Sequence, residues 1–333
     1  MTRDVHPTVS VVVPVYNEED ALETFFNKMR KELGSLGVSW EIVCVNDGSC
    51  DGSFAKLQTY VNDDDRIKVV DLSRNFGKEA ALTAGLDHAS GQAVVCIDVD
   101  LQDPPELIGP MIEKWREGYE MVYATRASRP TDGFLKRISA ERFYGAYNLM
   151  SSVKIPENTG DFRLMDSKVL DALSRLNERN RFMKGMFAWV GFKSTALEFE
   201  RGERLKGTTK WSFWKLWNFA IDGLTSFSTL PLRVWTYLGL IIALLSFGFA
   251  SFIVARIVIS GVSVPGYASL MVVVLFLGGL QMISLGVIGE YLGRVYEEVK
   301  QRPVYLVRER LGFDALPKTK TEQSRISRRA AAQ

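Results

Sequence analysis

The 333-residue sequence lacks the two glycine-rich motifs that most often mark a phosphate-binding loop. It contains no GxxxxGK[ST] segment, and no GxGxxG follows the first predicted strand. The first absence argues against a P-loop nucleotidase and the second against a dinucleotide dehydrogenase, because each class uses its glycines to bring backbone N–H groups to a phosphate. Any phosphate chemistry in this chain must therefore use other residues.

Cysteine is scarce as well, with three residues in the whole chain. Cys44 and Cys96 lie in apolar, strand-like runs, where free cysteines pack as small hydrophobic residues. The N-terminal stretch MTRDVHPTVS lacks the basic-then-apolar pattern of a cleavable signal. A formal charge of +2 gives no reason to expect a nucleic-acid partner. These features predict a reducing, cytosolic setting for the first part of the chain.

Long apolar runs are confined to the C-terminal third. Thr236–Ser260 and Ala268–Leu292 each exceed the roughly 20 residues that a membrane-spanning helix needs, and only a short loop separates them. Two buried helices of a soluble domain are the alternative, but such helices normally keep a polar stripe, which these runs almost lack. We therefore predict a two-helix transmembrane hairpin over residues 233–293.

The charges around this hairpin predict its orientation. The connecting loop has no Lys or Arg, whereas Arg233 precedes the first run and Arg294 and Lys300 follow the second, so both ends should lie in the cytoplasm of a plasma or inner membrane. Residues 211–232 mix tryptophans with lysines, which favours interfacial amphipathic helices, although a core helix can carry the same aromatics. Residues 294–333 are predicted to form a basic cytosolic tail that is partly disordered.

The first third of the chain alternates β-branched runs with amphipathic runs, which predicts crossover connections and an α/β domain with a mostly parallel sheet over residues 1–210. The expected strands are Val9–Val15, Glu41–Asn46, Ile67–Leu72, Ala93–Asp98 and Met121–Thr125. The expected helices are Glu19–Leu33, Ser53–Asn62, Lys78–Ala89 and Pro105–Glu117.

Polar residues follow one predicted strand after another. Ligands of such sheets bind beyond the carboxyl ends of the strands, so these residues are candidates for a site. Asp98 and Asp100 are two positions apart, and in an extended segment both side chains would lean to the same side. Two carboxylates so placed suit Mg²⁺ or Mn²⁺. A lone DxD is a weak signal, and its place at a strand end is what gives it value.

Several segments together resemble a known family. VSVVVPVYNEE, EIVCVNDGSCDGS, LSRNFGKEAALTAGL, CIDVDLQDPPE and TGDFRLMD, followed by RLKGTTKW, are similar to inverting family 2 glycosyltransferases of the A-type, Rossmann-like fold. Within that family the chain resembles the polyprenyl-phosphate glycosyltransferases from residue 8 to about residue 305. The resemblance implies a nucleotide sugar and a polyprenyl phosphate as substrates. It also implies a homo-oligomer, since relatives with this anchor form tetramers.

The resemblance further implies roles for individual residues. The nucleotide-sugar site would comprise Pro14, Tyr16, Glu18, Asp47, Asp98, Gln102, Arg204 and Lys210. The metal would be held by Asp98 and Asp100, the catalytic set would be Asp100, Asp161 and Arg126, and the acceptor phosphate would meet Arg126, Arg129, Lys136 and Arg137. Asn46 stands where the family often has a second acid before Asp47, which puts a role for that first acid in doubt.

Two of these assignments have plain structural alternatives. Asp161 could orient the acceptor or take a residual proton, but it could equally cap a loop or pair with Arg163. Residues 126–150 combine basic and apolar side chains that could hold a lipid phosphate at the headgroup layer, or could form a solvated helix packed on its own domain.

The predicted function is inverting, metal-dependent transfer of a hexose to a polyprenyl phosphate such as undecaprenyl phosphate. UDP-glucose is the preferred donor because GDFRLM and FMKGMFAWVGF resemble the bacterial glucosyl branch. GDP-mannose, UDP-GlcNAc, UDP-GalNAc and UDP-aminoarabinose remain alternatives. A processive polysaccharide synthase is disfavoured because its Gln-x-x-Arg-Trp segment is absent. A catalytically silent scaffold or flippase component is the alternative from another class.

Overall fold

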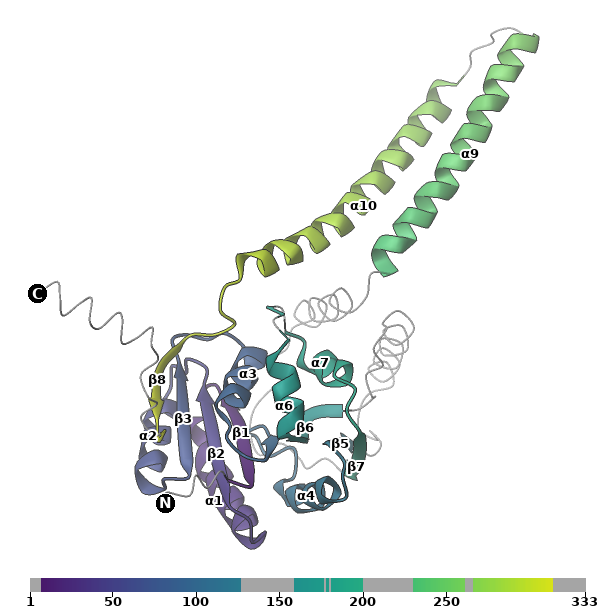
Figure 1. Ribbon diagram of the computed structural model, residues 1–333. Helices are drawn as coiled ribbons and strands as arrows, with labels where there is room; N and C mark the ends of the chain where they lie inside the picture. Colours follow the sequence, from purple (N-terminus) through teal and green to yellow (C-terminus); the bar gives the residue numbers. More distant parts are fainter. Residues whose placement is uncertain are drawn as a thin grey trace, which may run out of the picture.

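The computed structural model describes residues 7–126, 159–176, 178–179, 181–199, 230–260 and 266–313. In them an α/β domain is joined to two long helices that run alongside one another (Figure 1). The strands are β1 Val9–Val15, β2 Trp40–Asn46, β3 Ile67–Leu72, β4 Ala93–Cys96, β5 Met121–Arg126, β6 Thr159–Asp166, β7 Ser194–Phe199 and β8 Val307–Leu311. The helices are α1 Glu19–Ser35, α2 Ser53–Asp63, α3 Lys78–His88, the 3-10 turn η1 Pro105–Leu107, α4 Ile108–Arg116, α6 Ser167–Ser174, α7 Met183–Trp189, α9 Leu230–Ser260 and α10 Tyr267–Lys300.

The strands form one eight-stranded sheet in the order β7-β5-β6-β4-β1-β2-β3-β8. β1 pairs in parallel with β2 and β4, β2 with β3, and β5 with β7. β6 runs antiparallel between β4 and β5, and β8 runs antiparallel at the edge beside β3. The sheet is therefore mixed but mostly parallel, as predicted, and its central strands end at one common edge.

Helices cover both faces of the sheet. One buried apolar cluster joins the sheet to α1, α2 and α4, and a second joins it to α3, α6 and α7. Phe25 and Phe26 of α1 are fully buried, and truncating either to alanine would cost about 3–5 kcal/mol. α3 lies very close to β1, because a Cβ added at Gly85 would come within 2.2 Å of Val12 Cγ1. A glycine is therefore required where α3 crosses the sheet.

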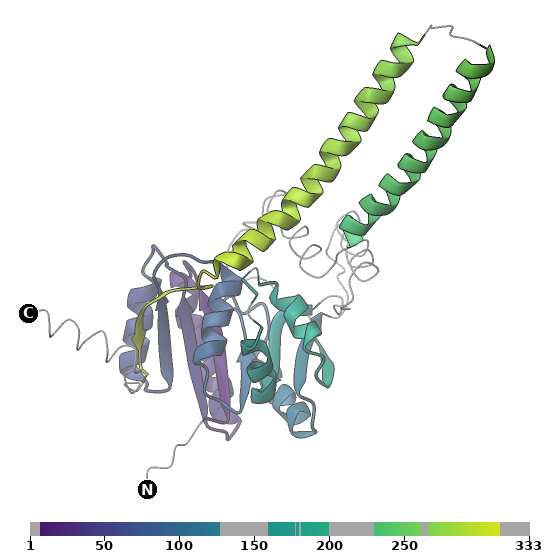
Figure 2. The ribbon, with the colours of Figure 1, turned by 45° about the horizontal axis from the view of Figure 1, so that its top comes forward.

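The alternating pattern located nine elements correctly, with ends that differ by a few residues. β4 ends at Cys96 rather than at Asp98, and the predicted helix over Pro105–Glu117 begins with the 3-10 turn η1. Three strands had no counterpart in the prediction, namely β6, β7 and β8. β8 lies within the segment expected to be a basic tail, yet it completes one edge of the eight-stranded sheet (Figures 1 and 2).

The return of the chain to the sheet is reinforced by side chains. Arg308 Nη2 donates a hydrogen bond to the Ser73 carbonyl at 2.7 Å, and Arg308 Nη1 lies 3.4 Å from Asp71 Oδ2. Tyr305 donates to Asp87 Oδ2 at 2.8 Å. The segment that follows α10 is thus anchored to β3 and α3.

Two long helices occupy the region predicted as a hairpin (Figure 2). Many of their large apolar side chains are exposed, as at Leu245 and Ile259 of α9 and Leu270 and Phe276 of α10. Within the described residues, one stretch, Phe276–Lys300, is long and apolar enough to cross a membrane. The first predicted span therefore stays a prediction. Of the interfacial helices expected over residues 211–232, residues 211–229 lie outside the described residues, and residues 230–232 belong to α9.

Candidate active site

The loops after β2 and β3 meet at the sheet edge, and Asp47 ties them together. Asp47 Oδ1 accepts a hydrogen bond from the Phe76 N–H at 2.7 Å, and Oδ2 accepts from the Gly77 N–H at 2.9 Å. Burial raises the pKa of Asp47, and these hydrogen bonds oppose the rise. Gly48 has φ +65°, and a Cβ there would lie 2.5 Å from the backbone of Arg74. The Asp47 carboxylate is thus engaged with backbone and shapes the start of α3.

The loop after β1 is bound to the loop after β2 in a similar way. Asn17, at φ 54°, donates its N–H to Ser49 Oγ at 3.0 Å, and its side-chain oxygen accepts from the Cys50 N–H at 2.8 Å. The Glu18 N–H donates to Ser53 Oγ at 2.9 Å. Tyr16 remains 42% exposed between these anchored residues. Pro14, Tyr16 and Glu18 therefore lie at the carboxyl end of β1, beside Asp47, where a nucleotide was expected.

Lys78 brings together two aspartates from different strands. Its Nζ lies 2.8 Å from Asp98 Oδ2, beyond the end of β4, and 2.6 Å from Asp161 Oδ2, on β6. The Lys78 side chain is 42% exposed, while that of Asp161 is 17% exposed. Of the two structural alternatives for Asp161, pairing with Arg163 is wrong as a direct ion pair, because the partner of Asp161 is Lys78.

The charges of this cluster shift one another's pKa values. Burial alone would raise the pKa of Asp161, but Lys78 and then Lys184 outweigh it and lower the pKa to about 2. Burial raises the pKa of Asp98 against the opposing effect of Lys78. Burial would lower the pKa of Lys78, but Asp161 and Asp98 raise it above its usual range. Burial, and then the Asp161 charge, raise the pKa of Glu79 to about 7.

Asp98 and Asp100 provide oxygens of the kind that a divalent cation prefers. The segment is not extended as predicted, because the chain turns at Val99 and Asp100 and Leu101 has φ 52°. Asp98 Oδ2 is paired with Lys78, and Asp100 Oδ1 accepts from the Gln102 N–H at 3.2 Å. Their other oxygens, Asp98 Oδ1 and Asp100 Oδ2, have no protein partner among the described residues. This donor set fits Mg²⁺ or Mn²⁺, which need only one or two carboxylates when substrate phosphates complete the coordination.

Gln102 is 2% exposed, and neither polar atom of its side-chain amide has a hydrogen-bond partner in the described part of the chain. A buried amide without partners costs free energy, so a ligand that bonds to it would recover that cost. The described residues contain no group of three or more His, Cys, Asp or Glu side chains able to hold a metal by themselves. A divalent cation at Asp98 and Asp100 would therefore need further oxygen ligands from a bound substrate.

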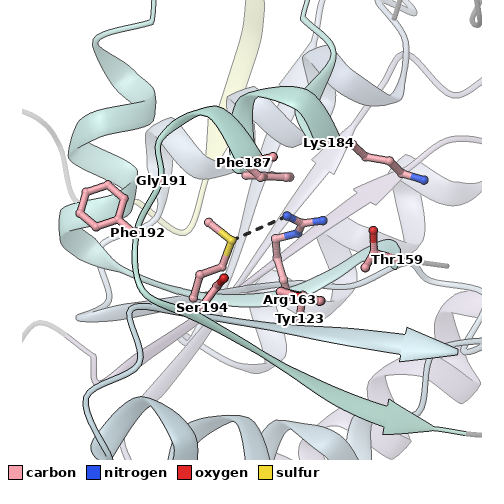
Figure 3. Close-up of a pocket in the computed structure, with 10 residues that line it drawn as sticks. Tyr123, Thr159, Arg163, Lys184, Phe187, Gly191, Phe192 and Ser194 are labelled. Carbon is pink, nitrogen blue, oxygen red and sulfur yellow. Dashed lines mark hydrogen bonds between the residues drawn. The ribbon is translucent and has the colours of Figure 1, made fainter. Parts of the chain in front are cut away.

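A cavity of about 170 Å³ lies between α7 and strands β5, β6 and β7, and Thr159 and Arg163, which flank Asp161 in the sequence of β6, line it. Among the described residues, its lining includes Arg163 and Lys184 and no acidic side chain. Figure 3 shows the Arg163 guanidinium below Phe187, while the Lys184 side chain extends from α7 to the right, above Thr159. Arg163 is buried against the Phe187 ring at 3.9 Å, and it donates to the Gly160 carbonyl and weakly to a methionine sulfur. Its Nε has no partner, so the cavity suits an oxyanion or a polyhydroxyl group.

The structure brings together only some of the predicted site residues. Lys78 contacts Asp98 and Asp161, and Asp100 and Gln102 follow Asp98 in the same loop. Arg126 is the last residue of β5 and lies at the same edge of the sheet, because β4 and β5 both run antiparallel to β6. The remaining basic predictions lie outside the described residues, namely Arg129, Lys136, Arg137, Arg204 and Lys210.

Four charged residues of the cluster were not predicted. Lys78 and Glu79 begin α3 directly after the loop that follows β3. The search for polar residues beyond each strand end, which led to Asp98, would have found them if it had continued to the start of the next helix. Arg163 and Lys184 gave no such signal, because β6 and α7 were not predicted.

Comparison with known proteins gives the family. The model of glycosyl transferase family 2 matches residues 10–174, and the model of the GtrB C-terminal hairpin matches residues 230–295. The first match covers β1 through α6, and the second covers α9 and most of α10. The α/β domain and the two long helices thus each match a recognised family model.

Two relatives agree with these matches. An uncharacterized glycosyltransferase of Synechocystis sp. is 58% identical over 93% of this chain and 97% of its own length. The bactoprenol glucosyl transferase of Shigella phage SfII is 50% identical over 90% of this chain and 97% of its own length. Among solved structures, glucosyl-3-phosphoglycerate synthase from Mycobacterium tuberculosis is 19% identical with a TM-score of 0.44, over 66% of this chain and 76% of that one. The family model and the two relatives of 50% identity or more show that the chain belongs to glycosyl transferase family 2.

Proposed function

We propose that this glycosyltransferase moves glucose from UDP-glucose to a polyprenyl phosphate such as undecaprenyl phosphate, with inversion at the anomeric carbon. The sugar and the lipid are supported by the 50% identity to a bactoprenol glucosyl transferase over nine-tenths of the chain. The observation that carries the chemistry is the cluster at the sheet edge, where Lys78 joins Asp98 to Asp161. The donor would lie over the loops after β1 and β2, with its diphosphate toward Asp98 and Asp100.

The residues around the diphosphate have separate tasks. Asp98 and Asp100 would hold Mg²⁺ or Mn²⁺, which when bound neutralises charge on the departing nucleoside diphosphate. Gln102 offers an unpartnered amide to a donor oxygen. Asp47 keeps the start of α3 in place through the N–H groups of Phe76 and Gly77, so Lys78 reaches the aspartates from a fixed backbone.

Asp161 is suited to orienting a substrate. A phosphate monoester has a second pKa near 6, so the acceptor is largely dianionic at neutral pH and needs little general base. With its pKa lowered to about 2, Asp161 is a weak proton acceptor while Lys78 holds it. Its Oδ1 is buried and has no partner, so it can accept a hydrogen bond from a sugar hydroxyl. The adjacent cavity with Arg163 and Lys184 carries the positive charge that an incoming phosphate favours.

A membrane location accounts for the rest of the chain. The acceptor is a lipid, and α9 and α10 expose large apolar side chains along much of their length. The hairpin would cross the plasma or inner membrane twice, with the sheet on the cytosolic side as the flanking Arg and Lys residues indicate. Homo-oligomerisation through this hairpin stays a prediction.

The test is transfer from a panel of radiolabelled UDP- and GDP-sugars to undecaprenyl phosphate, with purified protein in detergent. Each reaction is run with Mg²⁺, with Mn²⁺ and with chelator. The expected result is one chloroform-soluble product, formed from UDP-glucose and abolished by chelator. A product from GDP-mannose or UDP-GlcNAc instead would correct the donor. No lipid product from any donor, with the protein folded, would favour a silent scaffold.

A further inference from the structure

One oxygen of a proposed metal ligand is already paired with a cation of the chain. Lys78 Nζ lies 2.8 Å from Asp98 Oδ2, and the same nitrogen lies 2.6 Å from Asp161 Oδ2. No other lysine of the described residues joins two carboxylates at such short distances on this edge of the sheet. The Lys78 ammonium therefore already pairs with the Asp98 carboxylate, which a bound divalent cation would be expected to neutralise.

We propose that Lys78 is a resident counter-cation of the donor site. In the nucleotide-free protein its ammonium neutralises Asp98 and Asp161, and a divalent cation gains the full use of Asp98 only when Lys78 moves away. This inference rests on the proposed metal role of Asp98. It adds a positioning residue that sets both the affinity for the cation and the geometry of Asp161.

The two aspartates need such a partner. Like charges that share a site oppose each other's ionisation, and a carboxylate with little access to water is costly without a counter-charge. Asp161 is mostly buried, and its second oxygen has no hydrogen-bond partner, so Lys78 supplies its main compensation. Lys78 therefore keeps Asp161 ionised and held toward β4 before any substrate arrives.

The same ammonium weakens cation binding. Mg²⁺ sits about 2.0–2.1 Å from its oxygen ligands, closer than the ammonium does, and two cations on one carboxylate repel each other. Lys78 can leave without rearranging the fold, because its backbone is fixed through Gly77 and its four-carbon side chain is 42% exposed. A donor diphosphate brings the negative charge that accommodates both cations. The cation should therefore bind weakly alone and tightly together with the nucleotide.

The experiment measures Mn²⁺ binding by electron paramagnetic resonance on the full-length protein in detergent, with and without UDP. Lys78→Gln removes the charge, and Lys78→Arg keeps it. Lys114→Met is the matched control, because Lys114 of α4 pairs with Glu117, the residue after that helix, at 2.8 Å and outside the site. Without UDP we expect Lys78→Gln to bind Mn²⁺ about tenfold more tightly than wild type. Lys78→Arg should bind equally or more weakly, and Lys114→Met should be unchanged.

The possible results separate the two proposals. If wild type binds no Mn²⁺ even with UDP, the metal role of Asp98 fails. If wild type binds Mn²⁺ but Lys78→Gln gains no affinity, only the role of Lys78 fails. Should Lys78→Gln not fold, as judged by thermal unfolding, Lys78→Arg still decides, because tighter Mn²⁺ binding by that variant contradicts competition by the charge.

Discussion

Asp47 Oδ2 accepts a hydrogen bond from the Gly77 N–H at 2.9 Å, so the end of β2 holds the residue that precedes α3. The other oxygen of the same carboxylate holds the Phe76 N–H. A residue expected to contact the nucleotide is thus fully engaged in positioning the neighbouring loop. Lys78, the next residue in the chain, depends on this arrangement for its reach to Asp98.

Asp47→Asn should lower both stability and transfer. The amide keeps one acceptor oxygen and places an NH₂ group against a backbone N–H, which leaves that donor unpaired. The expected loss is about 1–3 kcal/mol in the free energy of unfolding. Thermal unfolding and the lipid transfer assay measure the two effects, with the exposed Asp63→Asn on α2 as control. Unchanged stability together with lost activity would instead indicate direct contact between Asp47 and the nucleotide.

Asp98→Asn and Asp100→Asn should each reduce transfer by at least about 100-fold while the protein stays folded. Each change removes a charge that would hold the cation at the diphosphate, where electrostatic stabilisation is usually the largest catalytic contribution. Initial rates at saturating donor, compared with thermal unfolding of the same samples, check this. If either variant turns over at near the wild-type rate, the aspartate that it replaces does not hold the metal.

Glu79 should make stability depend on pH in a defined window. Its pKa is raised from 4.5 to about 7, so between these values the folded protein holds a proton that the unfolded chain has released. Stability from this source is present below pH 4.5 and is lost as the pH rises to about 7. Glu79→Gln lacks this dependence. Its melting temperature should therefore rise relative to that of wild type as the pH increases from 4.5 to about 7. The exposed Glu117→Gln, directly after α4, serves as control, and parallel curves for all three proteins would refute the assignment.

Arg308→Ala should destabilise the catalytic domain although Arg308 lies beyond both long helices in the sequence. Asp71 is fully buried, and after the change only the Asn46 amide would bond its carboxylate. The expected cost is about 1–3 kcal/mol, reduced by the solvent exposure of Arg308. The melting temperature is the measurement, with the exposed Arg116→Ala as control. The double variant Arg308→Ala with Asp71→Asn should recover part of the loss.

The sequence predicted the parallel half of the sheet because each of its strands is a short apolar run that ends in polar residues. β6 was not predicted, since the buried charges of Asp161 and Arg163 interrupt its apolar residues, and the partner of Asp161, Lys78, is distant in the sequence. β8 reads VRERL, and charged residues are typical of an edge strand but also of a solvated tail. Antiparallel pairing of such segments depends on long-range contacts that no local pattern encodes.

The candidate site divides in the same way. Asp98 and Asp100 could be found because they follow a strong strand, and the family likeness placed Asp161 near them. The contact between Lys78 and Asp161 could not be found, because it joins the start of α3 to a strand inserted much later in the chain. The local sequence was enough to locate Asp98 and Asp100. Pairing of Lys78 with Asp98 and Asp161 depends on the order of strands in the sheet.

The return of the chain to β3 limits how far the catalytic sheet can move from the hairpin. Only the residues from Gln301 to Leu306 separate the end of α10 from β8, and a stretch of that length reaches at most about 20 Å when fully extended. With α10 in a bilayer, the sheet stays within that distance of the helix end throughout the reaction cycle. The lipid phosphate, confined to the membrane surface, then meets the enzyme at a high local concentration by diffusion in two dimensions.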